Sequence, residues 1–438
     1  MMQWFDSMNT WLQASPQWLA LAIFLIACLE CLAIAGIIIP GTVVLFTLAA
    51  LAGNGALELW QTLLLAYAGG LLGDAISYTL GRHFHQSIRR LPVLREHPEW
   101  LTSAETYFQR YGVISLLVGR YIGPLRPMLP LVAGMLDMPA VRFALVSMLA
   151  AAGWAVAYML PGWATGAALR LPLPEGFWGA IGIVCAGLAV VLLLIIQASL
   201  RERRWAASLA ALLGAIALAA LLIGFPHLDS LDQGLMTLVQ DERSHAFDAI
   251  AVLITRLGDF HVQLATGTLL IVLLLAARRW QAGLFVTGSL LLAATATTIL
   301  KHLLERTRPD VLLHPLESYS LPSGHTSAAF AFFLALGVLA GRGSAARTRL
   351  SWLLVATLPA LAIALSRVYL GVHWPSDIIA GVLVALTSCA LSLALVQRAA
   401  PMQALPARVW WLVIPACAAL FGAMVTWELS AALLRYRY

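Results

Sequence analysis

The sequence predicts an all-α protein that crosses a membrane many times. Of its 438 residues, 61% are hydrophobic and only 11% are charged, and the mean hydropathy is +0.86. A water-soluble core could not hide this much apolar surface, whereas a membrane span needs about 20 apolar residues. The net charge of +6 is scattered over loops. Because no basic patch carries interleaved aromatic residues, we expect contact with membrane lipids and no binding of nucleic acid.

Four unbroken spans are expected in the first half. They lie near Trp18–Ile39, Leu59–Leu80, Ala140–Leu160 and Phe177–Gln197. A polar leader, Met1 to Gln17, precedes the first of them and has neither a basic residue nor a small-residue cleavage site. We therefore interpret the first stretch as a retained span and not as a signal peptide that is removed.

Two further apolar stretches of the first half are interrupted at about membrane depth. Thr42–Gly53 follows Pro40-Gly41, and Val113–Leu131 contains Gly123-Pro124 and Pro127. Neither stretch is long and regular enough to cross a bilayer singly, so both are expected to form re-entrant hairpins. The freed backbone groups must then line a cavity enclosed by protein. Two such interruptions in one half are typical of a transporter.

The second half contains seven apolar runs, each interpreted as a span. They are Trp205–Phe225, Val262–Ala277, Ala282–Leu300, Thr326–Ala340, Leu350–Leu365, Ile378–Val396 and Val409–Trp427. Basic clusters occupy alternate turns, beginning with Arg201–Arg204, and the positive-inside tendency places those turns in the cytoplasm. The intervening turns, around residues 301–308, 323–325 and 367–377, are therefore expected on one outer face.

The charged cluster at Arg201 separates these two apolar architectures. We accordingly predict three parts: a membrane domain with re-entrant hairpins at residues 1–200, a six-helix domain at 201–400, and one additional C-terminal span at 401–438. The last span delivers Arg435 and Arg437 to the outer face, against the positive-inside tendency.

Two cations and a helix start in the second half have the chemistry of a phosphate site. Lys301, the only lysine, precedes Arg308 by two helical turns, so both can grip one phosphoryl group, and Pro309 ends the helix. Pro322-Ser323-Gly324 precedes a small-residue helix, where backbone N–H groups and the Ser323 hydroxyl can cradle phosphate oxygens.

Two histidines supply the reactive groups. His325 follows the anion cradle and is placed to protonate a leaving group. After Ser366-Arg367 comes His373, with Asp377 four residues along, close enough to hold one ring nitrogen and leave the other free to attack phosphorus. We expect a phosphohistidine intermediate, with neither a metal nor another cofactor.

These three segments resemble the phosphatidic acid phosphatase type 2 superfamily, whose pattern is Lys-x6-Arg-Pro, Pro-Ser-Gly-His and Ser-Arg-x5-His-x3-Asp. The resemblance covers about Trp205 to Val396. It implies that phosphate is bound by Lys301, Arg308, Ser323, Gly324 and Arg367, and that the catalytic residues are His325 as acid, His373 as nucleophile and Asp377 as its orienting partner. Soluble haloperoxidases share these motifs, but the membrane-spanning context disfavours them.

Buried charge is the notable feature of the first half. Glu30 lies in the middle of a span, where an isolated carboxylate costs several kcal/mol, so it needs a partner. Arg120 and Arg126, both in the second interrupted stretch, are the candidates. Asp74 is a second embedded acid, which we expect nearer a membrane interface.

The same residues, with Pro40-Gly41, resemble the DedA family of bacterial membrane proteins over about residues 18 to 197. The resemblance implies paired re-entrant hairpins and movement of lipid phosphates, notably undecaprenyl phosphate, with proton coupling, and it assigns roles to Glu30, Arg120 and Arg126. Many members carry an acid after the Pro-Gly pair, whereas this chain has Thr42. A buried ion pair that only fixes the hairpins is the alternative.

The leading hypothesis is thus a two-part lipid enzyme of the bacterial inner membrane. Its second half hydrolyses a lipid phosphate or pyrophosphate at the periplasmic face, with undecaprenyl pyrophosphate as the expected substrate, and its first half translocates a lipid. Phosphatidylglycerol phosphate, phosphatidic acid and lipid A phosphates are alternative substrates, and the first half could instead act only as a scaffold. This architecture is compatible with a homo-oligomer. A transporter with a dead phosphatase is disfavoured, since no catalytic position is missing.

Overall fold

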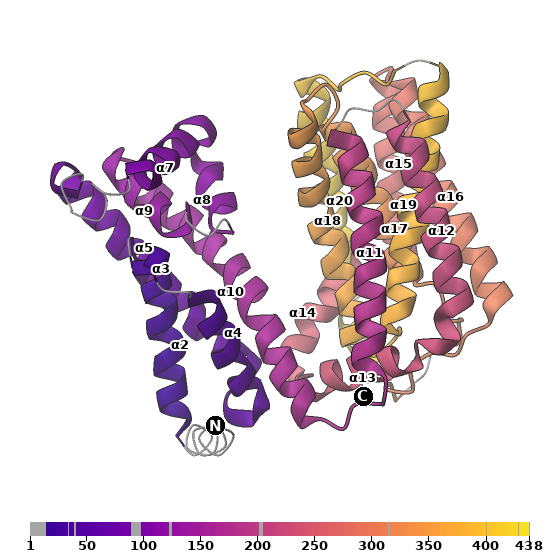
Figure 1. Ribbon diagram of the computed structural model, residues 1–438. Coiled ribbons are helices and arrows are strands. Elements are labelled where there is room, and N and C mark those ends of the chain that lie inside the picture. The colour runs from indigo at the N-terminus through magenta and orange to yellow at the C-terminus, as the bar shows by residue number, and fades with distance from the viewer. Residues whose placement is uncertain are drawn as a thin grey trace. The chain divides into compact units, whose positions relative to one another are not determined.

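Two compact units, Met1–Pro172 and Leu173–Tyr438, make up the protein, and each is described by itself. The computed structural model describes residues 15–33, 35–38, 41–88, 98–121, 125–200, 205–313, 316–399, 401–427 and 429–437. All regular elements within these ranges are helices, as the sequence predicts (Figure 1).

The first unit is a set of long and short helices. They are α2 (Pro16–Cys31), α3 (Ala35–Ile38), α4 (Gly41–Leu51), the π-helical turn η1 (Ala52–Ala56), α5 (Leu59–Ile88), α7 (Pro98–Tyr111), α8 (Val113–Gly119), α9 (Leu125–Met135) and α10 (Ala140–Arg170). Helix α5 packs against α2 and α9, and α10 packs against α4 and α5. The α5–α2 contact is close because Gly69 and Gly73 lack side chains: a Cβ there would lie 2.2 Å and 2.4 Å from backbone oxygens of α2.

The first predicted span is wrong in its continuity. Helix α2 ends at Cys31, Leu32 is extended (φ −74°, ψ 132°), and α3 begins only at Ala35. The break is stabilised from another helix, because the Ser77 hydroxyl of α5 accepts a hydrogen bond from Ala33 N (2.9 Å) and donates one to Cys31 O (3.1 Å). A partner 44 or more residues away leaves no signal in the local sequence.

Short helices stand where the sequence predicted hairpins. Helices α3 and α4 follow the first break, and α8 and α9, which pack against each other, form the second stretch. Pro127 lies in the first turn of α9, where a proline is tolerated. Pro40, Gly123 and Pro124 lie outside the described residues. Re-entry of the two pairs stays a prediction.

The second unit is a helical bundle. Its helices are α11 (Phe177–Leu200), α12 (Ala206–Gly224), the 3₁₀ turn η2 (Phe225–His227), α13 (Asp229–Asp241), α14 (His245–Arg256), α15 (Phe260–Ala276), α16 (Trp280–Leu304), α17 (Gly324–Ala340), α18 (Ala346–Tyr369), α19 (Pro375–Ala399), α20 (Ala407–Thr426) and α21 (Leu429–Arg435). The seven predicted runs correspond to α12 and to α15 through α20. Helix α19 packs against α12, α16 and α17 and forms the centre. Helices α13, α14 and α21 were missed, because they are short and less uniformly apolar.

Helix α11 belongs to the second unit. It packs against α12, α13 and α18. The structure therefore divides the chain one helix earlier than the boundary that the sequence suggested between residues 200 and 201. Arg201–Arg204, the cluster behind that expectation, lies outside the described residues. A charged turn marks the end of a span, but only packing shows which unit the span joins.

The segment after α20 returns to the bundle. Helix α21 packs against α14, and Leu313 N donates a hydrogen bond to Arg437 O (3.1 Å). The segment Leu429–Arg437 thus lies beside the loop that follows Arg308, whereas the sequence left the side of this tail undecided.

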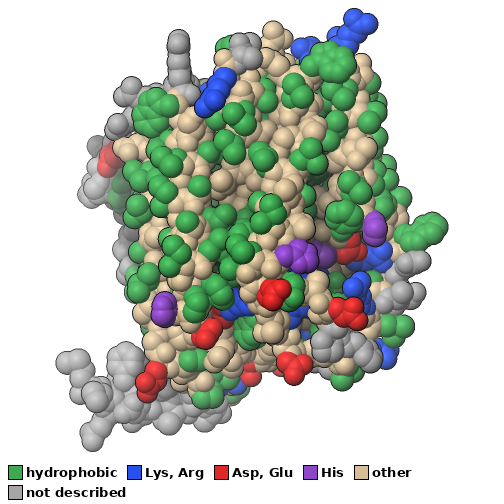
Figure 2. Space-filling view, turned by 90° about the vertical axis from the view of Figure 1, so that its right-hand side faces the viewer, with side chains coloured by type: hydrophobic (Ala, Val, Ile, Leu, Met, Phe, Trp, Pro, Cys, Tyr) green, Lys and Arg blue, Asp and Glu red, His purple; other side chains and the backbone are tan. Residues whose placement is uncertain are grey.

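The helices have the length and composition of membrane spans. Among the described residues, eight helices are long and apolar enough to cross a membrane, or up to nine if the pair Phe247–Arg256 and Phe260–Ala276, bent by 45°, is one span. Helices α2, α4 and α17 are apolar but shorter. Figure 2 shows apolar side chains over most of the visible face, with histidine and most acidic side chains in its lower half and basic side chains both there and at its upper end. Such a polar band at one end is expected of a site at a membrane surface.

Candidate active site

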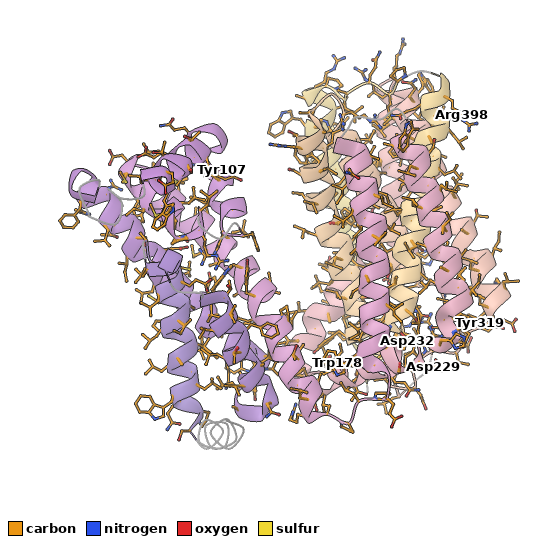
Figure 3. The ribbon with its side chains drawn as sticks, viewed as in Figure 1. Tyr107, Trp178, Asp229, Asp232, Tyr319 and Arg398 are labelled. Carbon is orange, nitrogen blue, oxygen red and sulfur yellow. The ribbon has the colours of Figure 1, made fainter. Side chains whose placement is uncertain are left out.

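The three motifs of the second half meet at one end of the bundle. The backbone N–H of Ser323 donates to the carbonyl oxygen of Asp377 (3.1 Å), which joins the second motif to the third. The first motif lies beside them, since a Cβ at Gly324 would be 3.9 Å from the Lys301 Cε. In Figure 3, Tyr319 and Asp232 mark this end of the unit, and Arg398 marks the opposite end.

Ser323 and Gly324 form the start of α17. The Ser323 hydroxyl is the N-cap of this helix and accepts hydrogen bonds from the Thr326 hydroxyl (2.9 Å) and the Thr326 N–H (3.5 Å). Lys301, in the last turn of α16, donates to the carbonyl oxygen of Tyr319 and, at 3.5 Å, to that of Ser320. Its ammonium therefore points toward the helix start, where backbone N–H groups favour an anion.

Arg308 is held by the backbone around the nucleophile. Its Nη1 donates to Val372 O (2.6 Å) and lies 3.1 Å from His373 Nε2, and its Nε donates to Ser318 O (2.6 Å). Burial, and next the charge of Arg367, lowers the pKa of Arg308 to about 10. The guanidinium remains a cation at neutral pH and faces His373 Nε2.

The contacts of His373 decide which ring nitrogen is nucleophilic. Nδ1 lies 3.3 Å from the Asp377 carboxylate, and Nε2 faces Arg308, which can only donate hydrogen bonds. Nε2 must then be the unprotonated nitrogen, while Nδ1–H donates to Asp377. Burial, followed by the charge of Arg308, holds the pKa of His373 well below its ordinary value of 6.5. The imidazole is therefore neutral and carries a lone pair toward the phosphate site.

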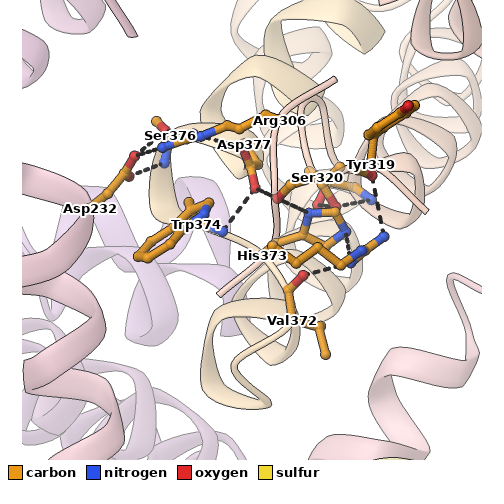
Figure 4. Close-up of polar contacts among 12 residues, drawn as sticks. Asp232, Arg306, Tyr319, Ser320, Val372, His373, Trp374, Ser376 and Asp377 are labelled. Atoms are coloured by element: carbon orange, nitrogen blue, oxygen red, sulfur yellow. Dashed lines mark hydrogen bonds and ion pairs between the residues drawn. The ribbon is translucent and has the colours of Figure 1, made fainter. Parts of the chain in front are cut away.

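A buried network that the sequence did not reveal fixes Asp377. Besides His373, the carboxylate accepts hydrogen bonds from the Trp374 N–H (2.9 Å), the Ser320 hydroxyl and Arg306 Nη1 (2.9 Å). Figure 4 shows the contacts that Arg306 makes with Asp377 and Asp232. Arg306 stands two residues before Arg308, but nothing in the sequence distinguishes it from a loop cation.

Asp232, on α13, anchors this network from the far side. Its carboxylate accepts from Arg306 Nη2 (2.6 Å), from the Ser376 hydroxyl (2.6 Å) and from the Ser376 N–H (2.8 Å). Arg306 thus stands between two carboxylates and neutralises charge that would otherwise be costly at this depth. The partner came from a helix that the sequence did not predict.

His325 also has a carboxylate partner, which the sequence analysis missed. Its Nε2 lies 2.9 Å from the Asp259 carboxylate, at the N-terminus of α15. The other ring nitrogen, Nδ1, is then the one left to serve a leaving group. Asp259 is 66 residues from His325, so only the fold pairs them.

Arg367 completes the set of cations. It lies in the last turn of α18, is 1% exposed, and its Nη1 donates to the Thr255 hydroxyl (2.9 Å). Among the described residues, none of Lys301, Arg308 and Arg367 forms an ion pair with a carboxylate, whereas the neighbouring Arg306 pairs with both Asp232 and Asp377. The site therefore combines three cations without acidic partners, which suits a phosphate.

An apolar cavity opens beside His325. It measures about 340 Å³ and lies among α15, α16 and the start of α17; its lining includes Phe260, Leu264, Leu290, Leu291 and His325. Volumes of about 300–1,000 Å³ are usual for ligand sites. His325 thus lines a cavity of a size that could hold part of a ligand.

The first unit brings its four predicted residues into one buried cluster. Arg126 pairs with Glu30, and Arg120 pairs with Asp74, which also accepts a hydrogen bond from Ser147. Asp74 is 1% exposed within this unit, and its expected position nearer a membrane interface stays a prediction. Trp154 stacks under both arginines, with its ring centre 5.1 Å and 5.6 Å from the two guanidinium carbons. Four charges in two pairs can be buried where one could not.

The chain that follows the break after Cys31 lies close to Glu30. A Cβ on Gly36 would lie 2.1 Å from Glu30 O, and one on Gly41 would lie 3.0 Å from the Glu30 carboxyl carbon. Only glycine permits this approach, and Thr42 follows directly. The cavity lined by Asp74, Arg120 and Arg126 measures about 10 Å³, room for about one water and too small for a phosphate.

The fold and the two charged clusters define a class of protein. It is a membrane protein with a candidate phosphate site around a buried histidine in one unit and paired buried charges in the other. Comparison with known proteins agrees. Residues 39–164 match the VTT domain, and residues 282–401 match the PAP2 superfamily. The chain belongs to the VTT/DedA family through its first unit and carries a PAP2-superfamily lipid phosphatase domain in its second, as the resemblances implied.

Individual relatives cover single parts of the chain. The inner membrane protein YabI of Escherichia coli is 40% identical over 152 residues, which are 35% of this chain and 60% of YabI, and protein DedA of the same organism is 25% identical over 42% of this chain and 79% of its own. A transmembrane PAP2-type phosphatidylglycerolphosphate phosphatase from Bacillus subtilis is a structural match with a TM-score of 0.35 and 25% identity, over 43% of this chain and 94% of that one.

Proposed function

We propose that the second unit hydrolyses a lipid phosphate or pyrophosphate at the periplasmic face through a phosphohistidine, and that undecaprenyl pyrophosphate is its substrate. The observation that carries the proposal is the environment of His373, whose Nε2 is unprotonated and faces Arg308 while Nδ1 is held by Asp377. A neutral, oriented imidazole beside three cations is suited to attack a phosphoryl group.

The proposed reaction has two steps. The lone pair of His373 Nε2 forms a bond to the terminal phosphorus, and the bond from that phosphorus to the oxygen that links it to the rest of the lipid breaks; in undecaprenyl pyrophosphate this is the bridging oxygen, and undecaprenyl phosphate leaves. The imidazolium form of His325, whose Nε2 is held by Asp259, gives its Nδ1 proton to that oxygen. His325 then takes a proton from water, whose oxygen attacks phosphorus and releases His373 and inorganic phosphate. Lys301, Arg308 and Arg367 stabilise the negative charge of the equatorial oxygens in both steps.

The apolar cavity beside His325 supports a lipid as the leaving group. The part of its lining that α15 and α16 supply is mostly apolar, with Gln263 and several threonines among it, and His325 lines it as well. A polyprenyl chain needs only such apolar contact, whereas a glycerol or sugar headgroup also needs hydrogen-bonding partners. This favours undecaprenyl pyrophosphate over phosphatidylglycerol phosphate, phosphatidic acid and lipid A phosphates.

A substrate panel with the purified full chain tests the catalytic proposal. We expect phosphate release from undecaprenyl pyrophosphate in the presence of chelator, with a kcat/KM above that for the three other lipids. Acid-labile, base-stable label from ³²P-substrate should appear on the wild type and not on His373→Ala. Phosphate release from His373→Ala at the normal rate would refute the nucleophile, and preference for a glycerolipid would refute only the substrate.

We propose further that the first unit moves undecaprenyl phosphate across the bilayer. Its support is the cluster of Arg120 and Arg126 with two buried acids, which could exchange carboxylates for a lipid phosphate. A scaffold that uses the same pairs only to fix its helices is the alternative.

Proteoliposomes separate these alternatives. If the first unit is a carrier, lipid movement should be lost in Arg126→Ala and retained in His373→Ala, while phosphatase activity shows the reverse. Arg142→Ala, at an exposed position of α10, is the matched control and should change neither. Absence of lipid movement in the wild type would support the scaffold.

A further inference from the structure

The segment Leu429–Arg437 lies outside the region that matches the PAP2 superfamily, yet one of its side chains reaches the phosphate site. Tyr436 is 6% exposed, and its hydroxyl accepts a hydrogen bond from Arg367 Nη1 (2.9 Å). Its ring centre lies 5.7 Å from the Arg367 guanidinium carbon. The site residue and this tyrosine are 69 residues apart.

Contacts on both sides hold Tyr436 in place. Arg243 Nη2 donates to the Tyr436 carbonyl oxygen (2.9 Å), and Arg243 Nη1 donates to Leu370 O (3.3 Å). The ring packs in a buried apolar cluster, whose other members are Ala251, Val252, Leu312, Leu370 and Val372. Leu312 follows Arg308, and Val372 precedes His373, so the segment ties together the loops of the first and third motifs.

Two hydroxyls determine how Arg367 is oriented. Nη1 donates to both Thr255 and Tyr436, at 2.9 Å each, so this nitrogen is committed to protein acceptors. The buried Nε, by contrast, has no hydrogen-bond partner. A buried N–H without a partner is costly, unless a ligand satisfies it. The edge of the guanidinium that carries Nε is therefore the edge left for a phosphate oxygen.

We propose that Tyr436 is a positioning residue of the phosphatase site, which orients Arg367 so that its Nε edge binds the substrate phosphoryl group. The inference rests on the proposed phosphatase function and extends it to a segment beyond the three motifs. The segment thereby makes the outer site dependent on the fold of α20 and α21.

The test is Tyr436→Phe in the purified full chain, with orthovanadate as a phosphate mimic. This change removes the hydroxyl and keeps the ring, so packing is preserved. We expect the vanadate inhibition constant and the KM for the lipid to rise about 5–10-fold, because one hydrogen bond to a charged group is lost, while kcat falls less than about 3-fold. Thr255→Val should act similarly, and the double variant should lose more than the two single variants combined.

Tyr369→Phe is the matched control. This tyrosine is a neighbour on α18 whose hydroxyl bonds only to the backbone of Ser244 in the described contacts. The Tyr369→Phe substitution should lower thermal stability without changing the vanadate inhibition constant. Wild-type inhibition and KM in Tyr436→Phe would overturn the role of Tyr436. A wild type that neither hydrolyses a lipid phosphate nor binds vanadate would instead overturn the phosphatase proposal itself.

Discussion

The two units bury arginine in opposite ways. In the first unit each arginine of the cluster has its own carboxylate, Arg126 with Glu30 and Arg120 with Asp74, and the cavity between them has room for about one water. In the second unit Lys301, Arg308 and Arg367 donate hydrogen bonds to carbonyl and hydroxyl oxygens. The carboxylate of Asp377 forms its ion pair with a different arginine, Arg306.

This difference teaches what each site can do as it stands. Cations without acidic partners keep their charge available, so the second site can receive a phosphate without rearrangement. Paired arginines are already neutralised, and the first cluster can bind an anion only if a carboxylate is protonated or moves away. The four experiments that follow test this contrast, from the largest expected effect to the smallest.

Loss of the nucleophile should have the largest effect. His373→Ala should lower kcat for lipid phosphate hydrolysis by about 10⁴-fold or more, since the covalent route is lost. Steady-state phosphate release measures it. His302→Ala, an exposed neighbour of Lys301, is the control and should change kcat less than about 2-fold. Equal losses in both variants would mean that the histidine acts through folding.

Breaking a buried pair in the first unit should cost stability, not phosphatase chemistry. Arg126→Ala leaves Glu30 unpaired and should destabilise the first unit by about 3–5 kcal/mol, whereas replacing both residues with apolar ones should cost much less. Thermal unfolding of the proteins in detergent compares the stability of the single and the double variant. If the single and double variants were equally unstable, the arginine would not be held by pairing.

The loss of rate caused by removing Asp259, the partner of His325, should depend on the leaving group. Asp259→Asn should slow hydrolysis of a lipid phosphate monoester by about 10²-fold, because an alkoxide needs a proton as it departs. p-Nitrophenyl phosphate, whose leaving group is a weak base, should be affected far less. The ratio of the two rates is the measurement, and an equal loss for both substrates would exclude acid catalysis as the role of this pair.

The pH dependence should show the smallest effect. Because burial and nearby cations lower the pKa of His373 below 6.5, protonation that removes the nucleophile should limit kcat/KM only below that pH. Arg308→Gln removes one of those cations, so the pKa of His373 should rise and the acid limb should move to higher pH by about 1 unit. Arg437→Gln, an exposed arginine on the same face, should leave the limb unchanged.

The share of the structure that could be predicted from the sequence differs between the units. Helical spans and the three spaced motifs could be identified because apolar length and short fixed spacings are local properties. The break after Cys31 could not, since its backbone groups are satisfied by Ser77 of another helix. For the same reason the pairing of Asp74 with Arg120 could not be predicted.

Taken alone, the sequence determined the class of the protein, the residues that gather at the candidate phosphate site and the pairing of Glu30 with an arginine of the second interrupted stretch. Only the tertiary structure decided the partners of the reactive groups: Asp259 for His325, Arg306 and Asp232 for Asp377, and Tyr436 for Arg367. A motif records spacing along one chain segment. These partners come from α13, α15 and the segment after α20, and a contact across such separations is fixed by helix packing, which leaves no local pattern.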